Sequence, residues 1–237
     1  NDDASITRLI LGRATQARLA RVYPVGAVTK GQAGEQLAQI GELRAAGCVA
    51  VSDDGRPVAN ASLMRRALEY AAMFDMPVID HCEDVSLAGD GVAHEGHHAA
   101  VLGLRGLPGV AEEIIVERDV TLSGLTGSPV HIAHISARGA LDAVRSGKDR
   151  GIRVSCEVTP HHLTLSDETL LGYHRDGSPF EALDEKAYDS NAKVAPPLRS
   201  RRDVDAMVQG LQEGVVDFVA TDHAPHGLVD KLCTLEE

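Results

Sequence analysis

The sequence contains no tryptophan, and aromatic residues make up only 3% of its 237 residues. Because 43% of the residues are apolar, a chain of this length can still bury a sizeable core, built from aliphatic side chains. The formal net charge is -12, which disfavours binding to nucleic acid or to an anionic membrane surface. No apolar run approaches the ~20 residues of a membrane-spanning helix, and no signal peptide is visible. We therefore expect a globular domain with neither a nucleic-acid nor a membrane partner.

Cysteine is also scarce, with four residues at positions 48, 82, 156 and 233. They lie far apart, and three of them end or sit within apolar, strand-like runs. This spacing favours buried, reduced thiols over disulfides, as is typical of a cytoplasmic protein.

Both ends of the sequence lack features expected of a complete chain. It opens with NDDASITRLI, without a methionine or a preceding strand, and closes with CTLEE, without a terminating element. We expect it to be an excerpt of a longer protein.

Short apolar runs alternate with segments of helical periodicity along the whole chain. The predicted strands are 22–28, 47–52, 76–80, 129–135, 152–158 and 216–221. The predicted helices are 4–19, 33–46, 60–75, 110–126, 137–149, 163–172 and 201–213. This alternation predicts an α/β fold in which helices cover a parallel sheet, with six strand–helix units in all.

Two helices carry recognisable start signals, and one polar segment interrupts the pattern. Asn60 and Ser136 each precede a helical run, and Gly147 is expected to close the second of these helices. The segment 174–190, HRDGSPFEALDEKAYDS, is polar and acidic and is expected to be a surface loop insertion.

Polar residues gather where the predicted strands end. They are Asp53 and Asp54; Asp80, His81 and Glu83; His131 and His134; Glu157, His161 and His162; and Asp222, His223 and His226. The carboxyl ends of parallel barrel strands converge on one face, so these side chains are expected to share a pocket. Imidazoles and carboxylates without an arranged serine or cysteine nucleophile are the ligand set of a catalytic divalent metal, above all zinc.

Several of these residues also have a purely structural interpretation. Asp53 resembles a helix N-cap, and His131 resembles a hydrogen-bonded core residue. The sequence PHH at 160–162 is compatible with capping the helix that follows. HEGHH at 94–98 looks like a metal motif, but it lies in a glycine-rich region without a preceding strand, which favours a solvated loop.

Six motifs taken together resemble the dihydroorotases of the class I bacterial type, within the amidohydrolase superfamily. They are VSDDGRP, DHCED, HIAHIS, EVTPHHL, KVAPPLR and ATDHAPH, in this order and spacing. YPVGAVTKG and LMRRALEYAAMFDMPVI extend the resemblance over essentially the whole chain. It implies a (β/α)8 TIM-type barrel that is incomplete here, with residues 1–237 forming a partial metal-dependent amidohydrolase domain.

The resemblance also implies a metal site that holds one or two Zn2+ ions. Its ligands would be Asp54, His81, His134 and Asp222. Alternation along a strand agrees with Asp54 rather than Asp53, because it places Asp54 on the same face as Ser52. The family's first-strand His-x-His-x-Arg motif is not in the sequence, so this piece alone is expected to lack two ligands and to be inactive.

Two further motifs carry expected roles in binding and catalysis. Asp222 would be both ligand and proton shuttle, His226 would reach the substrate, and His223 would support the site or pack beside it. Many relatives have Asn where this chain has Ala195, so the substrate contact is made by main chain there or is missing; Asn191 is a candidate substitute.

The implied activity is the interconversion of dihydroorotate and N-carbamoyl-L-aspartate in pyrimidine biosynthesis, by a cytoplasmic homo-oligomer. One alternative is a hydantoinase or allantoinase, whose metals are usually bridged by a carbamylated lysine, and CVAVSDDGRP contains no lysine. The other alternative is a non-catalytic barrel that scaffolds aspartate transcarbamoylase, which is also a conceivable partner of the enzyme.

Overall fold

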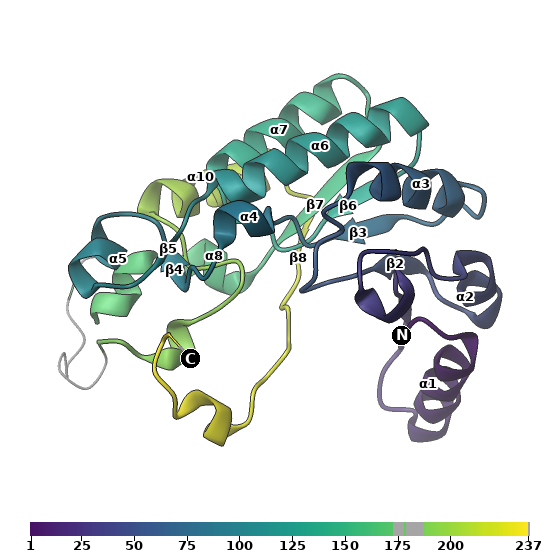
Figure 1. The fold of residues 1–237 in the computed structure, drawn as a ribbon, viewed down its shortest axis with the longest axis horizontal. Coiled ribbons are helices and arrows are strands. Elements are labelled where there is room, and N and C mark those ends of the chain that lie inside the picture. The colour runs from purple at the N-terminus through teal and green to yellow at the C-terminus, as the bar shows by residue number, and fades with distance from the viewer. Residues whose placement is uncertain (173–177, 179–186, 237) are drawn as a thin grey trace. The chain divides into compact units, whose positions relative to one another are not determined.

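The computed structural model describes residues 1–172, 178 and 187–236 (Figure 1). The chain divides into two compact units, each described here by itself. Unit 1 comprises residues 1–82, 117–133 and 146–155, and unit 2 comprises residues 83–116, 134–145 and 156–237. The single domain predicted for 1–237 stays a prediction, and the predicted insertion 174–190 falls largely outside the described residues.

Six parallel strands lie within the six predicted apolar runs. They are β1 (Val25–Gly26), β2 (Ala50–Ser52), β3 (Val78–Asp80), β6 (Val130–Ile132), β7 (Val154–Val158) and β8 (Phe218–Val219). Hydrogen bonds order them β1-β2-β3-β6-β7-β8, which follows their order along the chain. The prediction of an α/β fold built on a parallel sheet is confirmed.

Helices separate these strands, as the periodicity predicts. The main ones are α1 (Ala4–Ala17), α2 (Ile40–Ala46), α3 (Ala61–Ala72), α6 (Val110–Thr126), α7 (Arg138–Asp149), α8 (Pro160–Thr164) and α10 (Arg201–Gln212). Short 3-10 turns are η1 (Lys30–Gln32), η2 (Asp167–Leu171), η3 (Ser190–Ala192) and η4 (Leu228–Lys231). Asn60 caps α3 as predicted, because its side chain accepts from the N–H groups of Ser62 and Leu63.

Three predicted helices differ from the structure. The predicted helix 163–172 is split into α8, which begins at Pro160, and the 3-10 turn η2, with residues 165 and 166 between them. Residues 33–39 are not helical, since the chain pairs back on itself through an antiparallel bridge between Thr29 and Leu37. Helix α7 continues past Gly147 to Asp149. A Cβ at Gly147 would lie 2.7 Å from Cγ1 of Val120, so this glycine permits close packing and does not end the helix.

The segment between β3 and α6 contains four short elements that the sequence did not predict. They are α4 (Val85–Ala88), β4 (Ala93–His94), α5 (His97–Leu102) and β5 (Gly106–Leu107). Strands β4 and β5 pair with each other in parallel as a separate two-stranded sheet. The prediction that 94–98 is a solvated loop is therefore wrong for His94, which lies in a strand, and for the residues that begin α5.

Each unit buries an aliphatic core, as the composition predicts. In unit 1 the fully buried side chains include Ile40, Leu43, Met64, Leu68 and Met76. In unit 2 they include Ile135, Leu141 and Met207. All four cysteines are free, and Cys48, Cys82 and Cys156 are buried, as expected of reduced thiols. Within the described part of the chain, every helix is too short or too polar to cross a membrane.

Candidate metal centre

The two aspartates that follow β2 differ in burial and in role. Asp53 is buried, and its Oδ1 accepts the main-chain N–H groups of Val28 at 2.8 Å and Thr29 at 3.1 Å. This carboxylate therefore fixes the turn after β1, a structural role. The side chain of Asp54 is 55% exposed, so its carboxylate remains accessible to a ligand.

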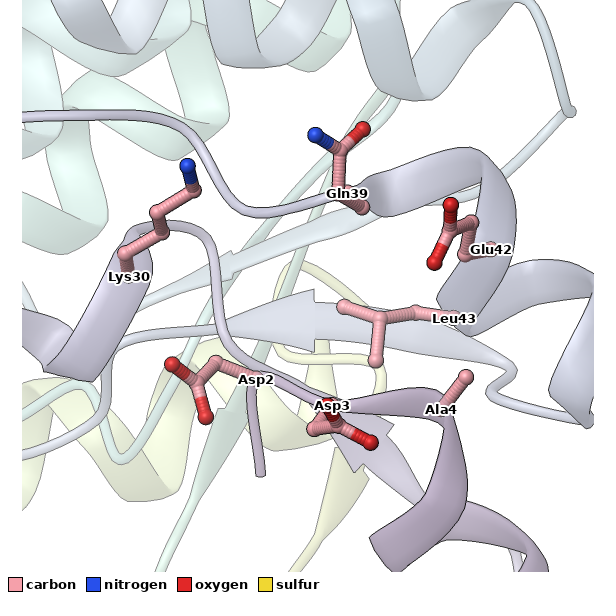
Figure 2. A pocket seen from close by; sticks show the side chains of 7 residues that line it. All are labelled: Asp2, Asp3, Ala4, Lys30, Gln39, Glu42 and Leu43. Carbon is pink, nitrogen blue, oxygen red and sulfur yellow. The ribbon is translucent and has the colours of Figure 1, made fainter.

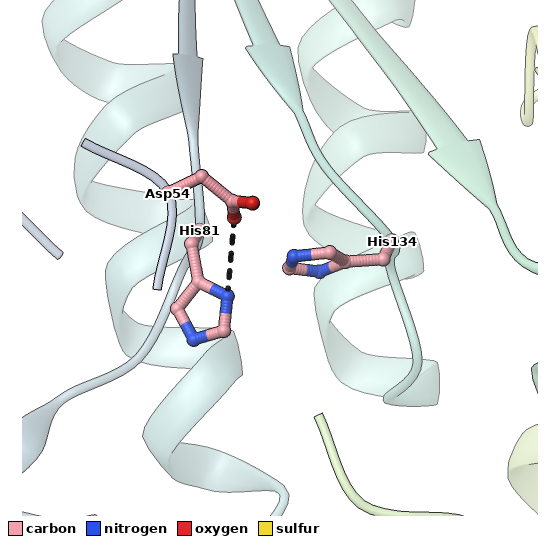
Figure 3. Close-up of side chains that lie close together, drawn as sticks. All are labelled: Asp54, His81 and His134. Carbon is pink, nitrogen blue, oxygen red and sulfur yellow. Dashed lines mark ion pairs between the residues drawn. The ribbon is translucent and has the colours of Figure 1, made fainter. Parts of the chain in front are cut away.

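His81 follows β3 directly and meets Asp54. Its side chain is buried, and its Nδ1 lies 3.6 Å from Oδ1 of Asp54 (Figure 3). This separation is too long for a good hydrogen bond. It is close to the roughly 3.3–3.5 Å that separates two ligand atoms on a tetrahedral ion with bonds of ~2.0–2.1 Å.

His134 completes the group from the end of β6. The peptide bond to Ala133 places it, and the N–H of Ala133 donates to the main-chain oxygen of Asp80 at 3.1 Å. The backbone of His134 is left-handed, with φ 34°, a conformation that non-glycine residues adopt at a cost of about 1–3 kcal/mol. One ligand atom from each of Asp54, His81 and His134 lies within 4.8 Å of the others (Figure 3).

The donor set fits a divalent metal of the zinc type. Two imidazoles and one carboxylate from three strand ends leave coordination positions open for water or substrate, as a catalytic site requires. His81 and His134 are buried, whereas Asp54 is exposed. The residues present therefore suit the metal that the sequence resemblance implies.

The remaining predicted site residues lie in exposed chain. Asp222 follows β8, is exposed, and has a left-handed backbone with φ 47°. It is not part of the Asp54–His81–His134 group found among the described residues. His226 is exposed in the irregular segment after Asp222, and Ala195 is exposed before the cis peptide bond to Pro196. Their roles stay predictions.

His161 is a neighbour of this chemistry to which the sequence assigned no role. It lies in α8 and is half-buried, and burial lowers its pKa. The Asp222 carboxylate acts in the opposite direction on the pKa of His161, and His134 lowers it further. Within unit 2, His161 is therefore electrostatically coupled to both predicted ligands, His134 and Asp222. The sequence signal for His161 was its place in the motif PHH at 160–162, and that motif is also compatible with capping a helix.

Two histidines of 94–98, His94 and His98, are tied into the structure of unit 2. Nδ1 of His98 pairs with Asp167 at 2.9 Å, and Nδ1 of His94 lies 3.4 Å from Nη1 of Arg199. Burial lowers the pKa of His94, and the Arg199 guanidinium lowers it further. These contacts give the segment a structural role.

Arg199 itself organises the turn that follows His134. The Arg199 side chain is 2% exposed, its Nε donates to Oγ of Ser136 at 3.0 Å, and its Nη2 lies 3.2 Å from Oε2 of Glu112. Glu112 also accepts the N–H groups of Ser136 and Ala137, at 2.8 and 3.0 Å. The ion pair therefore holds the main chain two residues beyond His134.

A pocket of about 270 Å³ lies elsewhere in unit 1, at the start of α1 (Figure 2). It is lined by Asp2, Asp3, Ala4, Lys30, Gln39, Glu42 and Leu43. Its carboxylates serve the fold: Asp2 accepts the N–H of Gly31, and Asp3 caps α1. None of the predicted site residues lines this pocket.

Comparison with known proteins identifies the family. Residues 7–140 match the family model described as Dihydro-orotase-like. The chain belongs to the dihydro-orotase-like family. This match covers more than half of the sequence, including Asp54, His81 and His134, and it agrees with the motif resemblance.

Individual relatives extend this family assignment over nearly the whole chain. A protein named Dihydroorotase from Acetivibrio thermocellus is 48% identical over 230 residues, which are 97% of this chain and 50% of the relative. One from Anaeromyxobacter dehalogenans is 52% identical over 231 residues, 98% of this chain and 50% of the relative. The dihydro-orotase-like chain thus spans about half the length of the curated relatives it matches.

Solved structures support the fold. The D-hydantoinase (dihydropyrimidinase) from Thermus sp. superposes with a TM-score of 0.61 at 24% identity, covering 81% of this chain and 42% of that one. The dihydropyrimidinase from Brevibacillus agri gives a TM-score of 0.65 at 19% identity, covering 91% of this chain and 47% of that one. At these identities the similarity shows that the dihydro-orotase-like chain shares their fold.

Proposed function

We propose that the intact protein is a metal-dependent cyclic amidohydrolase that interconverts dihydroorotate and N-carbamoyl-L-aspartate. The observation that carries this proposal is the convergence of Asp54, His81 and His134 at three strand ends in a dihydro-orotase-like chain. The name Dihydroorotase, borne by relatives of 48% and 52% identity, indicates the substrate.

The metal would be zinc, as one or two ions, held by Asp54, His81 and His134, with Asp222 as a further ligand. A bound zinc ion lowers the pKa of a coordinated water and polarises a carbonyl oxygen. The buried imidazoles would bind it through neutral nitrogens, and the exposed Asp54 carboxylate would balance its charge.

Asp222 would handle the proton in both directions of the reaction. When the ring amide is hydrolysed, the attacking water gives up a proton and the departing ring nitrogen must gain one. A carboxylate at Asp222 can accept the proton from the water as a general base and deliver it to the nitrogen as a general acid. His226 would contact the substrate, and the chain at Ala195 would offer its main chain in place of the usual asparagine side chain.

The biological setting follows from the same assignment. We propose that the protein acts in de novo pyrimidine synthesis, in the cytoplasm, as a homo-oligomer. Aspartate transcarbamoylase would be a partner if that enzyme and this protein associate. A hydantoinase or allantoinase activity and a purely scaffolding role are the alternatives that the experiment must separate.

The test is turnover of the intact protein with its metal content determined on the same sample. Asp222→Asn should lower both dihydroorotate hydrolysis and carbamoyl-aspartate cyclisation by about 10²–10⁴-fold, because it removes the proton acceptor while preserving size. Substrate affinity should change far less. The matched control is Asp217→Asn, the same change at a carboxylate that accepts the main-chain N–H of Cys156 at 2.8 Å.

Each alternative gives a different result in this experiment. Faster turnover of hydantoin or allantoin than of dihydroorotate would assign the hydantoinase class. A folded, zinc-loaded protein with no turnover of any of these substrates would favour the scaffold. Near-normal turnover in zinc-loaded Asp222→Asn would remove Asp222 from the proton-transfer role.

A further inference from the structure

A single guanidinium in unit 1 connects the two chain segments that carry Asp54 and His81. Arg118, in α6, has a side chain that is only 13% exposed. Its Nη1 donates to the main-chain oxygen of Val58 at 2.8 Å and lies 3.4 Å from that of Ala59. These carbonyls belong to the loop that begins at Asp54 and leads into α3. Arg118 therefore anchors the far end of the loop that presents the carboxylate.

The other side of the same guanidinium reaches the strand end that carries His81. Nη2 of Arg118 lies 3.3 Å from Oδ2 of Asp80, the last residue of β3. Because successive side chains of a strand point to opposite faces, fixing the Asp80 side chain also fixes the direction in which His81 points. The main-chain oxygen of Asp80 accepts the N–H of Ala133, so both sides of this strand end are held.

A second carboxylate fixes the orientation of the guanidinium. Oδ1 of Asp119 lies 2.8 Å from Nε and 2.7 Å from Nη2 of Arg118, and the Asp119 side chain is fully buried. This two-point contact sets the plane of the guanidinium, which leaves Nη1 directed at the Val58 carbonyl. The Cys82 thiol completes the cluster, 3.7 Å from both Asp80 and Asp119.

This cluster is not a second metal site. One ligand atom from each of Asp80, Cys82 and Asp119 lies within 4.8 Å of the others, which resembles a cation site. Arg118 already places a positive charge between these two carboxylates. Burial opposes the charge of Arg118, but Asp119 and Asp80 outweigh it and raise the pKa of Arg118, so the guanidinium stays charged.

We infer that Arg118 is a positioning residue that sets the separation of the Asp54 carboxylate and the His81 imidazole, an inference that rests on the proposed function. Five N–H groups in one plane let arginine bind a carboxylate on one side and main-chain carbonyls on the other. Lysine has the same charge but a single ammonium, which cannot hold Asp119, Asp80 and Val58 together in this geometry. Residues that orient metal ligands from behind typically contribute 10–100-fold to metal affinity or activity.

The first test is Arg118→Lys in the intact protein, measured as zinc affinity by competition with a chromogenic chelator. We expect affinity to fall by about 10–100-fold. In the zinc-saturated variant kcat for dihydroorotate should fall while KM changes little, because the substrate-binding residues are untouched. The matched control is Arg153→Lys: Arg153 also binds a carbonyl and a carboxylate, at Gly127 and Asp75, but precedes β7.

A second variant separates positioning from folding. Arg118→Met combined with Asp80→Asn and Asp119→Asn removes the guanidinium together with both of its carboxylates, so no buried charge is left without a partner, and such complete replacement of a buried charged group is often tolerated. This triple variant should keep its urea midpoint within the range of the Arg153→Lys control and still bind zinc about 10–100-fold more weakly than the parent.

The possible outcomes separate failure of this inference from failure of the proposed function. A parent protein that binds no zinc through Asp54 and His81 would overturn the proposed metal centre itself. A parent that binds zinc while both Arg118 variants bind it equally well would overturn the positioning role alone. Zinc affinity lost equally in Arg153→Lys would show a general effect of stability and would also overturn it.

Discussion

Two arginines, Arg118 largely shielded from solvent and Arg199 buried, hold main chain near predicted metal ligands, and their surroundings differ in charge. Arg118 in unit 1 lies between two carboxylates, Asp80 and Asp119, so one guanidinium is shared by two acids. Arg199 in unit 2 faces one carboxylate, Glu112, and its charge is balanced. Burial raises the pKa of Asp80 well above its usual range, and the neighbouring Asp119 carboxylate adds to this.

The partners of the two acids explain the difference. Glu112 receives the main-chain N–H groups of Ser136 and Ala137 as well as Arg199, so its charge is matched by donors on every side. Asp119 accepts hydrogen bonds from Arg118 and lies close to a second carboxylate, that of Asp80. In unit 2 the Glu112 carboxylate is held by main-chain donors as well as by Arg199, whereas in unit 1 Asp119 is held by Arg118 and lies beside a second carboxylate.

The largest expected effect comes from neutralising each acid. Glu112→Gln should lower the free energy of unfolding by roughly 1.5–3 kcal/mol, because charge-assisted hydrogen bonds to buried main chain are weakened. Asp119→Asn should change it by less than about 1 kcal/mol, since the lost bond to Arg118 is offset by relief of repulsion from Asp80. Urea denaturation of both variants makes the comparison. Equal losses would show that the two clusters work in the same way.

An effect that grows as the pH falls concerns His162, which is buried in unit 2. Its Nε2 lies 3.1 Å from the oxygen of Pro196 and its Nδ1 lies 2.8 Å from Oγ1 of Thr159, an arrangement that suits a neutral ring. Burial lowers the pKa of His162 to about 3, from 6.5 in the unfolded chain. Between these values the unfolded state binds more protons, so stability falls as pH falls from 6.5 towards 3, by at most about 1.4 kcal/mol per pH unit.

Replacing His162 tests whether its contribution to stability falls as the pH falls. His162→Gln cannot be protonated, so the difference in unfolding free energy between parent and variant should shrink as pH is lowered from 7 to 4. His223→Gln, the same change at an exposed histidine, serves as the control. A constant difference across this range would mean that His162 does not titrate differently on folding.

The sheet could be predicted from sequence because its strands are short runs of branched apolar residues between helical segments. The elements between Val85 and Leu107 could not, because none exceeds six residues and none shows a period. Gly147 was misassigned as a helix end for a related reason. Its missing side chain serves packing against Val120, a contact between helices that sequence does not display.

The residues of the candidate site also differ in whether they could be predicted from sequence. The sequence placed Asp54 and His81 among polar residues at strand ends, and the family resemblance, with which strand alternation agrees, singled out Asp54 over Asp53. Arg118 and Arg199 could not, because an arginine in an amphipathic helix or after a proline pair is usually exposed. Their burial depends on carboxylates that are distant in sequence, namely Asp80 for Arg118 and Glu112 for Arg199.

The most direct test is the zinc content of the intact protein and of three histidine variants, measured by mass spectrometry after gel filtration. His81→Ala and His134→Ala each remove an imidazole from the proposed centre. His131→Ala removes an imidazole from β6, the strand that leads to His134, where Nδ1 of His131 instead meets Oγ of Ser155 at 2.8 Å. The account predicts bound zinc in the parent and in His131→Ala, and its loss in the other two. Zinc retained equally by all three variants, or absent from the parent, would contradict it.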